Sequence, residues 1–283
     1  INSLFEPTFS FDPRSIMLFT GSAFGRDKTY NDSHLINPES DVPQNLIEVP
    51  VTIFGGSDGN LSNDDYLLFY GRGPSGFNLN ADEVKWHQNL YFNESMYWLF
   101  IPKNISVRGQ RINTANLINT SSTELDYARV FIHSEIDIIN PQESGLLWGN
   151  KSISSGASIL ETVEVINPSI QTAMTGTLGM IGNEKTNTRF KNTPHSIALF
   201  KDNTKIIDSN WANIGPKSID FTISRNLINE GFNILRLKNQ SNNSNSEPFY
   251  DYLNVSYLRK LNYVKPFDFF TSSDNVNKKF KIN

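Results

Sequence analysis

The strongest constraint on the fold of this chain is the recurrence of short segments in which apolar and polar residues alternate. Residues 47–54 and 129–138 are two clear examples. Alternation with a period of two is typical of a strand that buries one face. Further strand segments are residues 160–166, 171–180, 196–201, 217–223, 232–237 and 250–257. No helical periodicity longer than two turns competes with them, and Asn, Gly, Pro and Ser separate them. The sequence therefore predicts an all-β chain of sandwich or barrel type.

A polar stretch without periodicity, residues 111–123, interrupts this pattern and predicts a domain boundary or a long loop. We expect a small N-terminal β domain over residues 1–124 and a jelly-roll-like β-sandwich over residues 125–262. Residues 263–283 are polar and basic and are interpreted as a linker toward a further domain. Within the sandwich, the run of Ser and Asn at 241–246 predicts a flexible polar hairpin loop.

The last long strand segment, residues 250–258, predicts which side chains are buried. Strict alternation puts Asp251, Leu253, Val255 and Tyr257 on one face, and Tyr250, Tyr252, Asn254, Ser256 and Leu258 on the other. The set containing Leu253, Val255 and Tyr257 is the more apolar. We therefore expect it to face the core of the sandwich, with Tyr252 half covered.

Composition excludes several classes of function. The chain of 283 residues has no cysteine, which excludes disulfides, a thiolate zinc site and a cysteine nucleophile within it. Its formal net charge of −4 does not indicate the positively charged surface that binds nucleic acid or an anionic membrane. No apolar run is long enough to cross a bilayer. The chain begins at Ile1 without a charged-then-apolar leader, so we expect a signal peptide to be absent or already removed.

An acidic, glycine-rich loop precedes the aromatic segment 66–70. Its carboxylates Asp58, Asp64 and Asp65 are candidate calcium ligands. When Gly59 is aligned with the invariant glycine of a twelve-residue calcium loop, Phe54 and Gly56 fall at two ligand positions and supply no side-chain oxygen. We therefore interpret Asp58-Gly59 as a turn that leads into a buried strand, and we expect no metal or other cofactor. A looser calcium site that uses Asp58, Asp64 and backbone carbonyls stays an alternative.

Motifs of common hydrolases are absent from the sequence. The four histidines, His34, His87, His133 and His195, have no zinc-site spacing, and no Gly-x-Ser-x-Gly elbow occurs. Glu135 and Asp137 are two residues apart and therefore share one face of a strand. Such a pair could serve a glycosidase, but it is more typical of the solvated face of an amphipathic strand.

The aromatic residues leave a carbohydrate-binding interpretation open. The four tryptophans are Trp86, Trp98, Trp148 and Trp211. Aromatic side chains commonly fill the cores of β-sandwiches, and we expect Trp98 and Trp211 there. Trp86 and Trp148 are expected to be partly exposed, and His87 adjoins Trp86 in the sequence. These three residues, Trp86, His87 and Trp148, are the candidate binding residues.

Four segments, read together, resemble the N-terminal, non-catalytic region of exported gingipain-type cysteine peptidases, most closely the type IX secretion sortase. The first segment, residues 58–74, contains Asp-Gly and then Tyr-Leu-Leu-Phe-Tyr-Gly-Arg-Gly-Pro, and the second, residues 87–99, contains His-Gln-Asn-Leu-Tyr and Tyr-Trp-Leu. The third, residues 133–149, contains His-Ser-Glu-Ile-Asp, Asn-Pro and Trp-Gly. The fourth, residues 250–267, begins with Tyr-Asp-Tyr-Leu-Asn-Val-Ser-Tyr. The chain departs from the family where Leu146 and Asn150 stand in place of its usual Arg and Glu.

The resemblance implies an exported protein that acts in the periplasm, at the outer-membrane surface or after secretion. It also implies that this part of the family is not an enzyme, because the catalytic His and Cys of the family lie further downstream. Its expected role is to position or shield the downstream peptidase domain, which is the expected partner, together with secretion-system proteins or surface glycan. We expect no nucleic-acid partner and no membrane insertion. The alternative is a carbohydrate-binding β-sandwich module.

Overall fold

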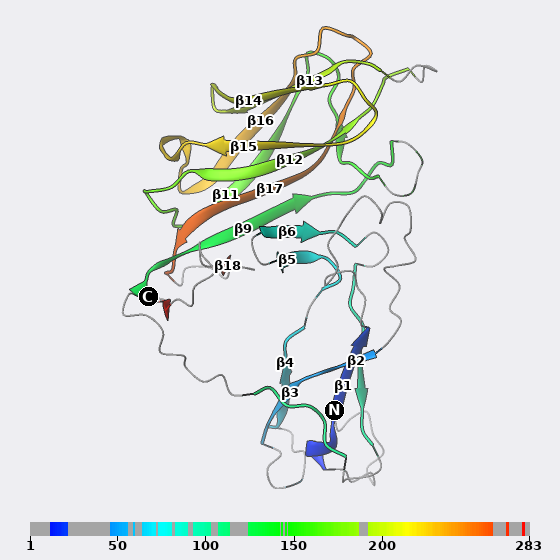
Figure 1. The fold of residues 1–283 in the computed structure, drawn as a ribbon, viewed down its shortest axis with the longest axis vertical. Coiled ribbons are helices and arrows are strands. Elements are labelled where there is room, and N and C mark those ends of the chain that lie inside the picture. Colours follow the sequence, from blue (N-terminus) through cyan, green and yellow to red (C-terminus); the bar gives the residue numbers. More distant parts are fainter. Residues whose placement is uncertain are drawn as a thin grey trace. The chain divides into compact units, whose positions relative to one another are not determined.

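The computed structural model (Figure 1) describes two compact units, which comprise Ile1–Ile118 and Asn119–Asn283. The described residues are 12–21, 46–55, 59, 64–71, 73–80, 83–89, 93–102, 107–113, 124–141, 143, 145, 147–186, 192–262, 270–271 and 279–280. Their helical structure is confined to two short 3₁₀ turns, η2 (Pro13–Ser15) and η6 (Arg225–Leu227). The predicted all-β class is therefore confirmed. A helix of sufficient length and apolarity to traverse a bilayer does not occur in this part of the chain.

The described part of the first unit forms a three-stranded antiparallel sheet and two hairpins. In the sheet, β1 (Met17–Gly21) pairs with β2 (Leu46–Val49) on one side and with β7 (Tyr97–Phe100) on the other. The hairpins are β3 (Val51–Phe54) with β4 (Tyr66–Phe69), and β5 (Gly76–Asn80) with β6 (Glu83–His87). Pro50 divides the predicted strand 47–54 into β2 and β3, because proline has no N–H to give to a sheet. Among the described residues of this unit, the buried hydrophobic side chains are Ile16, Leu18 and Val51.

Two expectations about burial in this unit are wrong. The segment that was expected to be a buried strand forms β4, but Tyr66 and Leu68 are more than half exposed. Trp98, which was expected in a core, is 46% exposed on β7. An apolar pattern indicates which side chains share a face, whereas burial of that face requires something to pack on it.

The second unit is a β-sandwich with the connectivity of a jelly roll (Figure 1). Its eight long strands are β9 (Tyr127–Glu135), β11 (Ser158–Val165), β12 (Met174–Gly182), β13 (His195–Lys201), β14 (Thr204–Trp211), β15 (Gly215–Ile223), β16 (Gly231–Asn239) and β17 (Phe249–Lys260). One sheet has the order β15-β12-β17-β9 and the other has the order β11-β16-β13-β14. The first of these eight strands in sequence therefore lies beside the last, as in two nested Greek keys.

Shorter strands extend this unit. β10 (Lys151–Ser152) pairs with β17, and β18 (Phe270–Thr271) pairs with β9. β8 (Glu124–Leu125) and β19 (Lys279–Phe280) form a parallel pair. The segment 263–283, which was expected to be a linker, thus contributes two short strands, and its other residues lie outside the described part of the chain.

The core of the sandwich lies between its two sheets. Alternating side chains of facing strands meet there, among them Leu178, Leu199, Leu235, Leu237 and Leu253, each 1% exposed or less. The two sheets bury these side chains because each long strand presents one apolar face. Trp211, which was expected in a core, is half-buried and packs against this cluster.

Strand β17 follows the predicted orientation over most of its length. Leu253, Val255 and Tyr257 are 1%, 2% and 3% exposed and belong to the core, as expected. The register with β12 shifts between Leu178 and Met180, which face Leu253 and Tyr250. β17 therefore contains one extra residue, a β-bulge.

The bulge reverses the orientation that was expected at the start of β17. Tyr250 was assigned to the outer face, but it is 2% exposed and belongs to the core. Asp251 was assigned to the core face, but it lies beside Glu135 and Asp137. The physical reason is that an inserted residue shifts the alternation by one position, and only the pairing with β12 reveals it.

Candidate functional site

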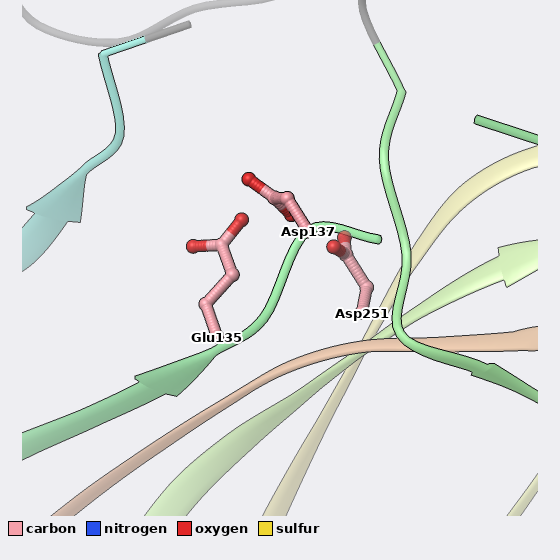
Figure 2. A group of neighbouring side chains, drawn as sticks. All are labelled: Glu135, Asp137 and Asp251. Atoms are coloured by element: carbon pink, nitrogen blue, oxygen red, sulfur yellow. The ribbon is translucent and has the colours of Figure 1, made fainter. Parts of the chain in front are cut away.

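Three carboxyl groups come together at one end of the sandwich sheet. Glu135 is the last residue of β9, Asp137 follows two residues later, and Asp251 lies in β17 (Figure 2). One ligand oxygen from each lies within 4.8 Å of the others. Within the described ranges, this is the one group of at least three acidic or histidine side chains with a geometry that could hold a metal ion.

Backbone pairing brings these three residues together. Ile139 and Gly149 exchange hydrogen bonds of 2.9 and 2.8 Å, which fixes the chain that follows β9. The amide of Asn150 then donates to the carbonyl oxygen of Tyr250 at 2.8 Å. Two segments that carry the family resemblance, 133–149 and 250–267, therefore meet at the carboxyl cluster.

The cluster is joined to a short row of polar side chains on the outer face of the sheet. Glu135 Oε2 lies 2.7 Å from His133 Nε2, and His133 Nδ1 lies 2.7 Å from Asn254 Oδ1. Cross-strand pairing of His133 with Asn254 places their side chains next to each other. This row orients the Glu135 carboxyl group.

Crowding and partial burial favour the protonated forms of two of these carboxyls. Asp137 as a whole is exposed, but partial desolvation of its carboxyl group among its neighbours, followed by repulsion from Glu135, raises its pKa to about 6. Burial, followed by repulsion from Glu135 and Asp137, raises the pKa of Asp251 to about 8. Close carboxylates cannot all ionise at low cost, so the cluster retains a proton near neutral pH, mainly on Asp251.

The geometry identifies what this cluster can do. Glu135 and Asp137 were an alternative glycosidase pair, and the structure places their oxygens within 4.8 Å of each other and of an Asp251 oxygen, as one cluster of three. Three carboxylates at this spacing could share protons, or could supply oxygen ligands to a hard cation such as Ca²⁺. Asp251 is the member that the sequence did not predict, because the bulge places it there.

The carboxyl cluster predicts a specific pH dependence of stability. The pKa of Asp251 is higher in the folded chain than in the unfolded chain, so the folded state binds its proton more tightly. This contribution to stability is fully present below about pH 4 and is lost as the pH rises toward about 8. We expect Asp251→Asn to be more stable than the parent chain at pH 8, by about 1 kcal/mol or more after allowance for solvent screening, and to show little difference at pH 4. Urea denaturation at half-unit pH steps measures this.

Asp126→Asn is the matched control, since Asp126 precedes the other end of β9 and lies 4.0 Å from Lys260. Its pH profile should parallel that of the parent chain. Equal profiles for Asp251→Asn and the parent chain would contradict the crowding of the three carboxyls.

The candidate binding residues lie in both units. Trp86 is half-buried on β6, where its Nε1–H donates to Gln88 Oε1 at 3.0 Å and its ring packs edge-on against Phe77. His87, the next residue, is 1% exposed. Trp148 is 38% exposed, and its Nε1–H donates to the carbonyl oxygen of Gly145 at 3.2 Å. Trp86 and His87 thus belong to the first unit, whereas Trp148 belongs to the second unit.

The acidic loop before β4 is described in part. Asp58 lies outside the described residues, Asp64 is exposed, and Asp65 is half-buried. The Asp65 carboxylate packs so closely on Gly55, whose φ is +95°, that a Cβ at position 55 would overlap it. Among the residues that the structure describes, neither Asp64 nor Asp65 belongs to a group of three potential metal ligands.

Comparisons with known proteins identify solved structures with a similar fold. No protein-family profile and no curated protein matches the sequence. The crystal structure of dimeric latent PorU from Porphyromonas gingivalis superposes with a TM-score of 0.64 and 12% identity, over 94% of this chain and 23% of the PorU chain. This chain therefore spans about a quarter of PorU.

Carbohydrate-binding modules give weaker matches. A CBM36 domain of a multidomain xylanase from the hindgut metagenome of Trinervitermes trinervoides has a TM-score of 0.32 and 12% identity, over 45% of this chain and 95% of that domain. CBM36 in complex with calcium and xylotriose has a TM-score of 0.30 and 9% identity, over 44% of this chain and 98% of that module. The comparisons show that the chain shares the fold of part of PorU.

Proposed function

We propose that this chain is the non-catalytic N-terminal segment of an exported, gingipain-type peptidase related to the type IX secretion sortase. Its role is to position or shield the catalytic domain that follows it. The observation that carries this proposal is the fold shared with PorU over 94% of the chain. The four motif segments, which occur in the expected order between Asp58 and Phe267, support it independently.

The chemistry of the chain agrees with a supporting role. It has no cysteine, so the thiolate and base of a cysteine peptidase cannot be assembled from its residues. We propose that it works without a bound cofactor. Its partner is the downstream peptidase domain, and it acts outside the inner membrane.

A surface suited to such a partner adjoins the carboxyl cluster. Ile136, Ile138, Ile139 and Trp148 are large apolar side chains of this region, and each is at least 38% exposed. Exposed apolar side chains that gather in this way are typical of sites that pack against another domain or protein. This surface is the part of the sandwich that we assign to contact with the peptidase domain.

The test asks whether this chain occurs together with a cysteine peptidase domain in the cells that produce it. Native protein captured with an antibody against the sandwich should yield, by mass spectrometry, peptides of this chain and of a cysteine peptidase domain in one polypeptide or one complex. The purified chain alone should not cleave Arg- or Lys-containing peptides. Capture of the chain as a free protein, or cleavage that survives substitution of its serines, would contradict the proposal.

A second candidate function is carbohydrate recognition by the sandwich. The exposed indole of Trp148 favours it, since exposed aromatic rings with a polar edge are suited to stacking on sugars. Trp86 and His87 are the corresponding residues of the first unit. Loss of saccharide binding in Trp148→Ala or Trp86→Ala, as measured by affinity electrophoresis, is the expected result for this function.

A further inference from the structure

An open groove of about 930 Å³ lies in the sandwich, away from the residues assigned above. Three segments line it: the start of β13, the end of β14, and the loop at residues 240–244 between β16 and β17. The two strand ends belong to one hairpin, and the pairing of β13 with β16 brings the sequence-distant loop at 240–244 beside them.

An aromatic pair forms part of the wall of the groove. His195 on β13 is the register partner of Trp211 on β14, and their ring centroids lie 5.1 Å apart. The indole nitrogen side of Trp211 packs on Gly182, where a Cβ would come within 2.9 Å of Nε1. Trp211 is half-buried and is anchored on one side, and it lines the groove.

His195 retains an unused hydrogen-bonding atom. Its side chain is 1% exposed, and Nδ1 lies 2.9 Å from Ser246 Oγ. Nε2 is buried and has no hydrogen-bond partner among the described residues. Burial lowers the pKa of His195, against a smaller opposing effect of Glu184, so the ring is neutral near pH 7. A buried polar atom without a partner is costly, and a bound ligand or water can satisfy it.

The loop at residues 240–244, which forms another part of the lining, is held by hydrogen bonds. The polar loop predicted at 241–246 connects β16 and β17. Ser241 Oγ donates to the carbonyl oxygen of Pro194 at 2.6 Å, and the backbone N–H of Asn245 donates to Asn243 Oδ1 at 2.9 Å. Buried Asn239 donates through Nδ2 to the carbonyl oxygens of Ile153 and Ser246. The loop is thus tied to neighbouring segments, and a preorganised wall lowers the entropic cost of binding.

The lining indicates the class of ligand. Besides the aromatic pair it consists of amide, hydroxyl and small side chains, including Asn210, Gln240, Asn242 and Ser244. None of these lining residues carries a formal charge, and none is a large aliphatic residue. Amides and hydroxyls can both donate and accept hydrogen bonds, and an aromatic ring packs on the apolar face of a sugar ring.

We propose that this groove binds a neutral saccharide, with Trp211 as the stacking surface and Gln240 and Asn242 as hydrogen-bonding partners. The proposal rests on the second candidate function and assigns it a site other than Trp148. A charged ligand would find no opposite charge in this lining, and an apolar ligand would leave its amides without partners.

The experiment uses the full chain labelled with 5-fluorotryptophan, in which the four tryptophans give separate ¹⁹F signals that single Trp→Phe substitutions assign. Cellohexaose, xylohexaose and mannohexaose are the neutral probes, and an oligogalacturonate is the charged probe. We expect a neutral probe to shift the Trp211 signal while the Trp148 signal stays in place. Gln240→Ala combined with Asn242→Ala should weaken binding about tenfold or more, because two hydrogen bonds are lost.

The double variant should leave the fold intact, because both side chains are exposed. Asn203→Ala, in the exposed turn at the other end of the β13–β14 hairpin, is the matched control and should bind like the parent chain. A shift of Trp148 alone would keep carbohydrate recognition but overturn the groove as its site. No shift with any of the neutral probes, or a Trp211 shift with a neutral Gly-Ser-Asn hexapeptide in place of sugar, would overturn the proposal itself.

Discussion

Val255→Asp is expected to unfold the sandwich at neutral pH. Val255 is 2% exposed and lies at the centre of the sandwich sheet β15-β12-β17-β9. It pairs there with Gly176 of β12 and with Ile132 of β9. A carboxylate in this position is surrounded by apolar side chains of the core and has no partner. We expect a loss of about 4 kcal/mol or more, which is comparable to the whole stability of many domains. Urea denaturation followed by far-UV circular dichroism measures the loss.

Ser256→Asp is the matched control for this substitution. Ser256 is the next residue, its side chain lies on the opposite face, and its Oγ accepts a hydrogen bond from Arg129 Nη1 at 3.2 Å. The same carboxylate is introduced there beside a positive charge and water, so we expect a change within about 1 kcal/mol. If both variants unfold at the same urea concentration, the assignment of the two faces of β17 is wrong.

The second large effect is expected from Gly176→Ala. Gly176 lies in β12 between Phe221 of β15 and Val255 of β17. A Cβ at this position would lie 2.4 Å from Phe221 Cζ and 2.5 Å from the backbone oxygen of Asn254. The aromatic ring could rotate away, but the backbone oxygen belongs to a central strand and cannot move without breaking the ladder. We expect a loss of about 3 kcal/mol, measured by thermal or urea denaturation.

Gly71→Ala is the control for this steric argument. At Gly71 the nearest neighbour of a Cβ would be Phe69 Cε2 at 3.5 Å, an ordinary van der Waals contact. We expect a change of less than about 1 kcal/mol in either direction. Equal losses of stability for alanine at Gly71 and at Gly176 would contradict this argument. They would show that β12 and β17 can move apart enough to accommodate a Cβ at position 176.

The sequence by itself determined the class of the fold and much of the orientation of its strands. Alternation is a local property, because neighbouring side chains of a strand point to opposite faces whatever the strand pairs with. Leu253, Val255 and Tyr257 could therefore be assigned to one buried face before any partner strand was known. The jelly-roll type could be anticipated from the number and spacing of such segments.

Only the tertiary structure decided what depends on the partners of each strand. The bulge in β17 arises from its pairing with β12, and it moves Tyr250 into the core and Asp251 to the carboxyl cluster. The exposure of Tyr66 and Trp98 depends on whether another layer covers their sheets, which no local pattern encodes. The groove joins His195, Trp211 and the loop at 240–244 because β13 pairs on both sides, with β14 and with β16. Side-chain periodicity is a property of consecutive residues. A site assembled from several strands forms only when those strands pair in the correct register.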